Sequence, residues 1–363
     1  RLKKFKEKGK VSNLNQLIAM FMHHIKSNEL NLNNIKKKVF NINEPLNQNR
    51  AALFLDIFEK IFNFYQANLV KENAIDFDDM IVLSREKITK ENFKYVLVDE
   101  FQDISKARAK LLKKIKEENN CKLFCVGDDW QAIYRFVGGD ISIFTKTFIK
   151  HFGYFERANI DTTFRYGENI NNVSSGFIQK NPEQLTKSVN TRRSNPKGDV
   201  CVYDLTNFKD IISKYAFKKE KIYILGRNNL NSYNSSFQKR YPKGNIVTKE
   251  EVKEITGKFD NVQYKTIHKS KGLEADHIFI INLFSGTEGF PSQKSDDEIL
   301  SLVHSNIDSF EFAEERRLMY VALTRARKSV HLFSGAGSRR WTLFLHCPVG
   351  LIKDCSARGV YFP

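Results

Sequence analysis

The sequence predicts an α/β protein with two parallel-sheet domains and a helical region on their N-terminal side. The first reason is length, since 363 residues are enough for two domains at roughly 150 residues per domain. The second is the helical spacing of apolar residues up to about residue 90. The third is a change of pattern after that point, where short apolar runs alternate with helical segments, as they do in parallel sheets.

The helical region is expected over residues 1–90. The segments "LNQLIAMFMHHI" and "AALFLDIFEKIFNFYQANLV" repeat apolar residues at the spacing of amphipathic helices. His23 and His24 in the first segment are predicted to be helix-surface or core residues rather than ligands.

The strands are expected in two sets. The first set is "KYVLVDE" and "KLFCVGDD", with the helix "KARAKLLKKIKEENN" between them. Val96, Leu97 and Val98 form an unbroken apolar run, which predicts a strand buried on both faces. The second set is "DVCVYDL", "KIYILGR", "VQYKTIH", "DHIFIINL" and "SVHLF", the last after a helix "AEERRLMYVALTRAR". The polar stretches "QKNPEQLTKSVNTRRSNPKGD" and "SGTEGFPSQKSDDE" are expected to be loops.

The composition favours an intracellular, polyanion-binding protein. There are 59 Lys and Arg against 42 Asp and Glu, a net charge of +17, and 12% of the residues are aromatic, which points first to nucleic acid. General solubility explains the charge equally well. The five cysteines show no paired C-x-x-C spacing, so no zinc site is expected. No apolar stretch approaches the roughly 20 residues of a membrane helix, and we expect a cytoplasmic protein without membrane partners.

Two carboxylates, Asp99 and Glu100, follow the first strand of the first sheet. The carboxyl edge of an open α/β sheet is where ligands bind, although a solvated loop is the more ordinary explanation of a lone pair. Phosphoryl transfer needs a magnesium carboxylate, a group that orients water, and cations near the γ-phosphate. Asp99 is therefore predicted to hold Mg²⁺ through water, and Glu100 to polarise the attacking water.

An aromatic pair lies beyond the second strand. Tyr134 and Phe136 alternate with Ile133 and Arg135, and aromatic faces beside positive charge suit the stacking of single-stranded bases. On spacing alone, an ordinary core position is the better explanation of the two rings. Gln131, just before them, is able to reach the same sheet edge or to be a loop amide.

Six segments occur in a fixed order and carry a resemblance. They are "IDFDDM", "VLVDEFQD", "VGDDWQAIYRFVGG", "DTTFRYGENI", "YKTIHKSKGLEADHIFIIN" and "EERRLMYVALTRAR". Over about residues 70 to 333 they resemble the later motifs of superfamily 1 DNA helicases of the UvrD/Rep type, and are most similar to the bacterial DNA helicase IV type. The interval from Arg165 to Thr266 is short, which supports that subgroup.

The resemblance implies two RecA-like parallel-sheet domains, the first of them incomplete, with an N-terminal helical insertion subdomain. The chain then divides into the helical insertion of the first domain (1–90), the C-terminal part of that domain (91–160), the second domain (161–333) and a divergent tail (334–363). The tail loses the preceding pattern abruptly, which predicts a reading-frame change or a foreign end.

The implied function is that of an ATP-dependent DNA helicase, with ATP and Mg²⁺ as cofactors, single-stranded and duplex DNA as partners, 3′ to 5′ translocation, and a place in DNA repair. The resemblance gives Asp99 and Glu100 the same two roles as above, makes Gln131 a sensor of the γ-phosphate, and makes Gln102 and Asp103 links to neighbouring motifs.

Further roles are implied on the second domain. Arg165 and Arg325 resemble arginine fingers directed at the γ-phosphate, a task for which a planar, permanently charged guanidinium is suited. Phe164 stands where the family commonly has a Tyr that stacks on adenine, and Glu274 resembles the carboxylate that binds the ribose. The DNA-contacting residues of the family are matched by Tyr134, Phe136, Thr266 and His268. His268 also fits a core histidine at the end of a strand.

One family motif is missing from the sequence. The phosphate-binding loop G-x-x-x-x-G-K-[ST] is absent, because "EKGKV" at residues 7–11 lacks both the upstream Gly and the following Ser or Thr. We therefore expect the chain to start inside the helical insertion and, by itself, neither to bind ATP tightly nor to hydrolyse it. Two alternatives stay open: a non-catalytic or degenerate DNA-binding remnant, and the motor part of a helicase-nuclease, for which no carboxylate-rich nuclease segment is seen.

Overall fold

The computed structural model forms two compact units, one of residues 1–156 and 295–307, the other of residues 157–294 and 308–363. Each unit is described by itself. The structure describes residues 10–42, 44–192, 198–233, 246–284, 286, 289–294, 296–304, 308–335 and 353–354, with side chains omitted at 10–12 and 353–354.

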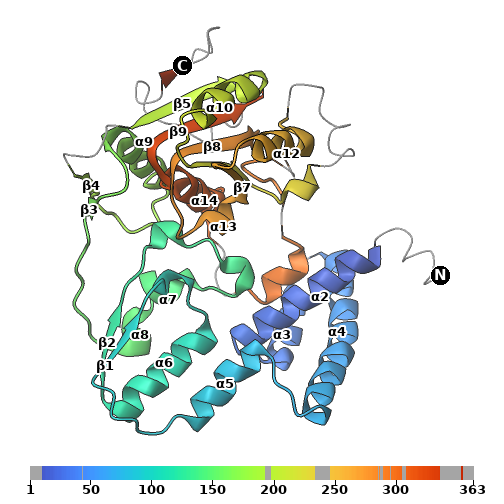
Figure 1. Cartoon of the computed structure of the whole chain (residues 1–363). Coiled ribbons are helices and arrows are strands. Elements are labelled where there is room, and N and C mark those ends of the chain that lie inside the picture. The colour runs from blue at the N-terminus through green and yellow to red at the C-terminus, as the bar shows by residue number, and fades with distance from the viewer. Residues whose placement is uncertain are drawn as a thin grey trace. The chain divides into compact units, whose positions relative to one another are not determined.

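The first unit begins with helices, as the sequence predicts (Figure 1). They are α2 (Lys10–Ser27), α3 (Leu32–Val39), α4 (Pro45–Lys71) and α5 (Phe77–Lys87). Their core contains Phe21, whose ring lies edge-on to Phe54 and Phe58 at centroid distances of 5.1 and 4.8 Å. Asp76 caps α5, because its carboxylate accepts the N–H of Asp79.

A short segment from much later in the chain completes this helical core. Residues 296–304 include the 3₁₀ helix η6 (Glu298–Leu302), and Ile299, Leu300 and Val303 are buried among the helices. The segment is anchored at the surface of the helices, since Lys38 donates to the carbonyl of Leu302 at 2.9 Å. A stretch that interrupts the second unit in sequence therefore belongs to the first unit.

The α/β part of the first unit holds the strands β1 (Tyr95–Val98) and β2 (Lys122–Cys125), which pair in parallel with Val98 opposite Cys125. Helix α6 (Lys106–Asn119) connects them, starting at the Ser105 cap and ending at Asn120 in the left-handed conformation. The remaining elements are the 3₁₀ helices η1 (Phe101–Asp103), η2 (Asp129–Gln131) and η3 (Arg135–Val137), and the helices α7 (Ile141–Thr145) and α8 (Phe148–Phe152).

The strand β1 differs from its prediction. Leu97 is 73% exposed, and burial alternates along β1 instead of being continuous. The reason is that α6, α7 and α8 pack against one face of the strand pair, where Val98 and Leu123 join their core. Among the described residues nothing buries the opposite face, so the apolar run is half-buried.

The second unit is built on a parallel sheet in the order β10-β5-β9-β8-β6-β7 (Figure 1). Its strands are β5 (Asp199–Asp204), β6 (Ile222–Gly226), β7 (Val262–Thr266), β8 (Ala275–Leu283), β9 (Ala326–Ser334) and the short β10 (Lys353–Asp354). The five predicted strands are all present in the expected order. A separate pair is formed by β3 (Thr162–Thr163) and β4 (Asn190–Thr191), and the second of these lies inside a stretch predicted to be a loop.

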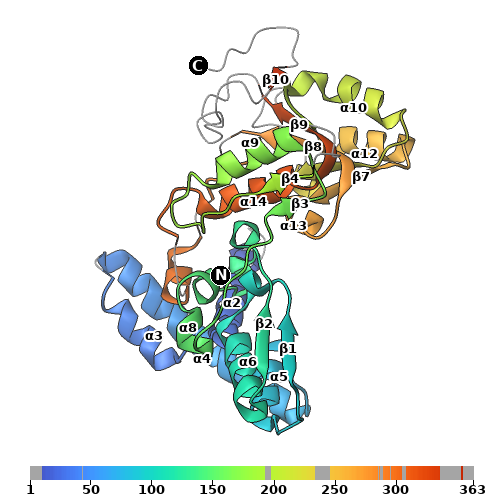
Figure 2. The ribbon, with the colours of Figure 1, turned by 90° about the vertical axis from the view of Figure 1, so that its left-hand side faces the viewer.

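Helices cover both faces of this sheet. Figure 2 shows α9 (Glu168–Ile178) and α14 (Ala313–Leu323) on one side, and α10 (Phe208–Ala216) and α12 (Lys249–Lys258) on the other. The short helix α13 (Ile267–Ser270) follows β7, and the 3₁₀ helices η4 (Leu205–Asn207) and η5 (Leu230–Ser232) follow β5 and β6. Phe279 and Phe333 are central to the core beneath α10 and α12.

The α/β class with parallel sheets is thus confirmed, while the division of the chain at residues 90, 160 and 333 stays a prediction. Most of the predicted divergent tail lies outside the described residues. No helix in the described ranges combines the length and the apolar character that a membrane crossing requires.

Candidate functional site

The acidic loop of the first unit lies directly after β1. Asp99 and Glu100 are both exposed, and Glu100 adopts the left-handed conformation with φ of 50°. The Asp99 carboxylate accepts the N–H of Glu100 at 2.8 Å, which fixes the turn. The backbone thus leaves β1 sharply, with both carboxylates at the carboxyl edge of the strand pair.

A chain of hydrogen bonds joins this loop to the loop after β2. The Gln102 amide donates to the Glu100 carboxylate, and its oxygen accepts the N–H of Asp128 at 2.9 Å. Gln131 then donates to the Asp128 carboxylate at 2.7 Å. Glu100 and Gln131, which the sequence assigned to one sheet edge, are therefore linked through two intervening residues, Gln102 and Asp128.

Two features of this network were not predicted. Asp128 was not singled out, although the acidic pair that ends "VGDD" was a visible signal. Gly127 permits the close approach of the two loops, because a Cβ at this position would lie 2.8 Å from the side-chain oxygen of Gln102. The predicted linking role of Gln102 agrees with this geometry.

Carboxylate oxygens at this edge fit the donor set of Mg²⁺. No group of three or more His, Cys, Asp or Glu side chains in the described part of the chain is arranged to hold a metal ion. Mg²⁺ does not need such a group, since it is usually held by one or two carboxylates together with water and substrate phosphates. Asp99 is therefore compatible with its predicted role.

The aromatic pair follows in the same unit. The rings of Tyr134 and Phe136 lie 6.0 Å apart between centroids, with 56° between their planes. Phe136 is 43% exposed and Tyr134 is partly buried, so the pair is not an ordinary core position. Both residues belong to the loop around η3.

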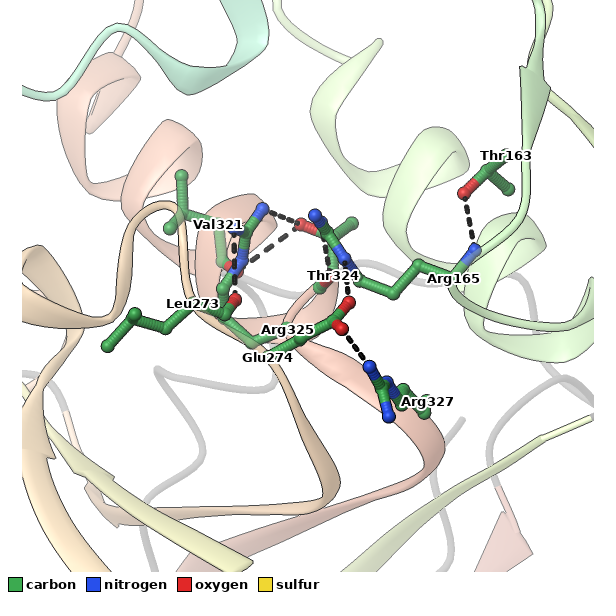
Figure 3. A network of polar contacts seen from close by, with 8 residues as sticks. All are labelled: Thr163, Arg165, Leu273, Glu274, Val321, Thr324, Arg325 and Arg327. Atoms are coloured by element: carbon green, nitrogen blue, oxygen red, sulfur yellow. Dashed lines mark hydrogen bonds and ion pairs between the residues drawn. The ribbon is translucent and has the colours of Figure 1, made fainter. Parts of the chain in front are cut away.

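The second unit brings the predicted cations together around Thr324 (Figure 3). Arg165 donates from Nε to Glu274 at 3.1 Å and from a terminal nitrogen to the carbonyl of Thr324 at 3.3 Å. Arg325 donates to the hydroxyl of the same Thr324 at 3.2 Å. Residues 165, 274 and 325 are far apart in sequence, and their joint placement supports the grouping that the resemblance implied.

Arg325 is buried, with 1% of its surface exposed. Its guanidinium also donates to the backbone carbonyls of Val321 at 3.0 Å and Leu273 at 3.4 Å (Figure 3). These carbonyls hold the guanidinium in place. Arg325 is thus a positioned positive charge at the junction of α14 and β9.

Glu274 has a second cationic partner, Arg327, with which it forms an ion pair. The hydrogen bonds from Arg327 and from Arg165 hold the pKa of Glu274 below its usual value. Thr324 and Arg327 were not predicted, although both lie within the motif "EERRLMYVALTRAR". A carboxylate that is ionised and partly exposed is able to accept hydrogen bonds from a ribose.

The other predicted residues of this unit lie at different places. Phe164 is 67% exposed, and the guanidinium of Arg192 lies 5.7 Å from its ring centroid. Thr266 ends β7 and caps α13, since its hydroxyl accepts the N–H of Lys269 at 3.3 Å. His268 is partly buried, and burial together with Arg227 lowers its pKa to about 4, so it is neutral near pH 7.

A pocket of about 680 Å³ opens at the carboxyl ends of β6 and β7. Its lining includes Thr266, Lys265 and Lys269, together with polar residues of the loop after β6 such as Asn229 and Ser232. Cationic and hydrogen-bonding groups in a hollow are suited to phosphate groups. Thr266 therefore lies in a setting that fits its predicted contact with DNA.

Two family models match the sequence. The UvrD/REP helicase N-terminal domain matches residues 2–152, and the UvrD-like helicase C-terminal domain matches residues 245–334. The first match covers the acidic and aromatic loops, and the second covers most of the network in Figure 3.

Several curated proteins are similar to the chain. It is 39% identical over 293 residues to DNA helicase IV of Escherichia coli, covering 76% of this chain and 40% of that protein. It is 27% identical over 357 residues to the ATP-dependent DNA helicase Rep of Buchnera aphidicola, covering 87% and 50%. It is 26% identical over 171 residues to the ATP-dependent DNA helicase PcrA of Leuconostoc citreum, covering 44% and 22%. The chain thus spans half or less of the length of each of these relatives.

Proposed function

The chain belongs to the UvrD/Rep helicase family, and from this premise we propose that it is part of an ATP-dependent DNA helicase that moves along single-stranded DNA. The proposed direction is 3′ to 5′, with unwinding of duplex DNA in the cytoplasm as part of DNA repair. The observation that carries the proposal is the hydrogen-bonded link between Glu100 and Gln131, because it joins the carboxylate that would polarise water to the amide that would sense the γ-phosphate.

The proposed nucleotide roles follow the chemistry of each side chain. Asp99 would hold Mg²⁺ through water, and the bound ion would neutralise charge on the phosphate oxygens. Glu100 would orient and polarise the attacking water. Arg165 and Arg325 would bring positive charge to the γ-phosphate, to which a permanently charged guanidinium is suited. The adenine and the ribose would be bound by Phe164 and Glu274.

The proposed DNA contacts combine stacking with phosphate binding. Tyr134 and Phe136 would stack on bases, which is tolerant of sequence because every base has a π face. Thr266 and His268 would contact the sugar-phosphate backbone, with Lys265 and Lys269 of the pocket adding positive charge.

These 363 residues contain no G-x-x-x-x-G-K-[ST] segment. The backbone amides and lysine of such a loop cradle the β- and γ-phosphates. We therefore expect the chain alone to bind single-stranded DNA but to show no DNA-stimulated ATP hydrolysis. A measured DNA-stimulated ATPase activity of the chain alone would contradict this part of the proposal.

Single-strand binding is tested by fluorescence anisotropy with a labelled oligothymidylate. Tyr134→Ala should weaken binding by about tenfold, because stacking is worth roughly 1 to 3 kcal/mol per base. The matched control is Tyr154→Ala, which removes a 98% exposed tyrosine of the same unit and should leave the affinity unchanged. The affinity should also fall steeply as salt is raised. Equal affinities of the two variants would overturn the assigned DNA contact.

Catalysis is tested in a longer protein that joins this chain to a family segment carrying the phosphate-binding loop. Glu100→Gln should lower DNA-stimulated ATP hydrolysis by about 10²- to 10⁴-fold, the range for loss of a general base. Single-strand affinity should not change. A protein that carries the loop and an intact Glu100, yet shows no hydrolysis, would favour the non-catalytic remnant.

A further inference from the structure

The loop that carries the aromatic pair lies directly on helix α2. Gly138, at the end of this loop, has φ of +80°, and a Cβ at this position would lie 2.2 Å from the hydroxyl oxygen of Ser27. Only glycine satisfies both the conformation and the close approach. The position of Tyr134 and Phe136 is therefore set in part by residues of α2.

His23 of α2 is the main polar contact of that helix with the loop. Its Nδ1 lies 2.8 Å from the carboxylate of Asp78, and its Nε2 lies 3.0 Å from the backbone carbonyl of Val137. Both partners only accept hydrogen bonds. A neutral imidazole has a single N–H, so both bonds form only when His23 is an imidazolium with two N–H groups.

The groups around His23 favour the charged form on balance. The hydrogen bond to Asp78 of α5 raises the pKa of His23, and the bond to the Val137 carbonyl adds to this, while burial and Arg108 of α6 act in the opposite direction. The result is a pKa above the ordinary value of 6.5. On α2 itself, His24 has its pKa lowered to about 4 by burial and is neutral near pH 7. The neighbouring cation Lys26 is paired with Asp76 and Asp79.

A second anchor of the loop comes from residues 296–304. Arg135, between the two aromatic residues, donates to the carboxylate of Asp296 at 2.8 Å. His304 lies beside it, with Nδ1 3.4 Å from the guanidinium. Asp296 and His304 belong to the segment that completes the helical core, and this anchor does not involve His23.

We propose that the His23 imidazolium is a positioning group for the DNA-binding loop, and that single-strand affinity falls when this imidazolium loses a proton. The inference rests on the proposed function, since it assumes that Tyr134 and Phe136 bind DNA. The sign follows from the geometry: at low pH both hydrogen bonds are present, and as pH rises through the His23 pKa the loop loses one of them.

The test measures the affinity of the 363-residue chain for labelled oligothymidylate from about pH 6 to pH 8.5 at constant ionic strength, a range that spans histidine titration. The wild-type affinity should fall about fivefold over this range, the effect of one hydrogen bond of ordinary strength. His23→Gln removes the titrating group, so this variant should bind the oligothymidylate weakly and with the same affinity at the lowest and the highest pH. His23→Arg, which donates to two acceptors at every pH, should keep the affinity high throughout.

Two more variants test whether the pH dependence comes from His23 itself. Asp78→Asn removes the carboxylate that favours the imidazolium, so the midpoint of the pH profile should move to lower pH. Asp296→Asn removes the second anchor and should weaken binding while the pH profile keeps its shape. A merely structural role of His23 would change stability but would not produce this shift of midpoint or the rescue by arginine.

The outcomes separate the two proposals. If Tyr134→Ala binds DNA as tightly as the wild type, the proposed DNA contact fails. If Tyr134→Ala weakens binding but the wild type shows a flat pH profile, or the same profile as His23→Gln, only the role of His23 is overturned. A direct measurement by NMR of a His23 pKa below 6.5 would overturn that role as well.

Discussion

Both units contain parallel strands made of apolar residues, yet the surroundings of those strands differ. In the second unit all five residues of β6 are buried, and in β8 Asp276 alone is only partly buried. In the first unit Leu97 of β1 and Phe124 of β2 are largely exposed. Helices account for the difference, since both faces of the larger sheet are covered while α6, α7 and α8 pack on one face of the smaller sheet.

The two sheets show that the burial of a strand depends both on its own residues and on the elements that cover it. An apolar run indicates that a strand is suited to burial on both faces, but the burial itself depends on helices that come from other parts of the chain. The same type of residue should therefore contribute very differently to stability in the two sheets.

The largest expected difference is between two phenylalanines on parallel strands. Phe279→Ala in β8 removes a fully buried ring and should lower the free energy of unfolding by about 3 to 5 kcal/mol. Phe124→Ala in β2 removes a ring that is 62% exposed and should change it by only about 0.5 kcal/mol. Hydrogen exchange of the strand amides measures both effects. Similar losses in the two variants would show that the exposed face of β2 is buried in solution.

A partly buried ion pair beyond the carboxyl end of β6 should give the next effect. Glu315 is buried, which raises its pKa, and it is held by Arg227 at 2.8 Å and by the N–H of Ser292 at 2.9 Å. Arg227→Ala leaves this carboxylate without its cation and should cost about 2 to 3 kcal/mol, near the lower end for breaking a buried pair. Urea denaturation measures the loss.

The control is Lys209→Ala, which breaks the exposed pair with Glu254 and should change the urea midpoint very little. An equal shift in the two variants would contradict the argument that burial gives the Arg227 pair its importance.

The two units should also differ in how a histidine responds to pH. Burial lowers the pKa of His331 in β9 to about 3. Because this pKa lies below the value of about 6.5 in the unfolded chain, the contribution of neutral His331 to stability is fully present above about pH 6.5. It is lost as pH falls toward 3, by about 1.4 kcal/mol per pH unit. His23 of the first unit has a raised pKa, so its contribution is present below about 6.5 and is lost as pH rises.

Urea midpoints measured between about pH 4 and pH 8 test this contrast over the titration range of histidine. His331→Leu should reduce the loss of stability on acidification of the second unit, and His23→Gln should reduce the loss on alkalinisation of the first. An unchanged slope in His331→Leu would show that His331 is not the group responsible.

The sequence predicted the parts of the site that lie within one motif. The strands and the acidic pair Asp99 and Glu100 follow from local pattern and from the rule that ligands bind at carboxyl ends of strands, whereas the linking role of Gln102 came from the family resemblance. The role of Asp128 depends on the register of β1 with β2 and on the close approach at Gly127, which no local pattern encodes.

Two further contacts between distant segments could not be predicted either, because no local pattern encodes them. Arg327 reaches Glu274 because β9 lies beside β8, whereas chain order alone does not give the order of strands in a sheet. The segment 296–304 reaches helices more than 200 residues earlier, and Asp296 finds Arg135 only in the folded chain. The prediction that β1 is buried on both faces was wrong, because coverage of a strand by helices is likewise a tertiary property.

The smallest expected difference concerns the caps of the helices that cover the two sheets. Thr248 starts α12 in a complete capping box: its hydroxyl accepts the N–H of Glu251 at 3.2 Å, and the Glu251 carboxylate accepts the N–H of Thr248 at 2.8 Å. Ser105 starts α6 with one longer bond, from the N–H of Arg108 at 3.4 Å. Because reciprocal capping satisfies two backbone donors, Thr248→Ala should cost about 1 to 2 kcal/mol and Ser105→Ala about 0.5 to 1 kcal/mol.

Thr248→Ser keeps the hydroxyl and is the matched control, expected to retain most of the stability. Hydrogen exchange of the first-turn amides of α12 and α6 reports each cap separately. A larger loss at Ser105 than at Thr248 would mean that α6, although it covers only one face of a two-stranded sheet, is the more important of the two helices for local stability. The contrast between the sheets would then be limited to their strands and would not extend to the helices that cover them.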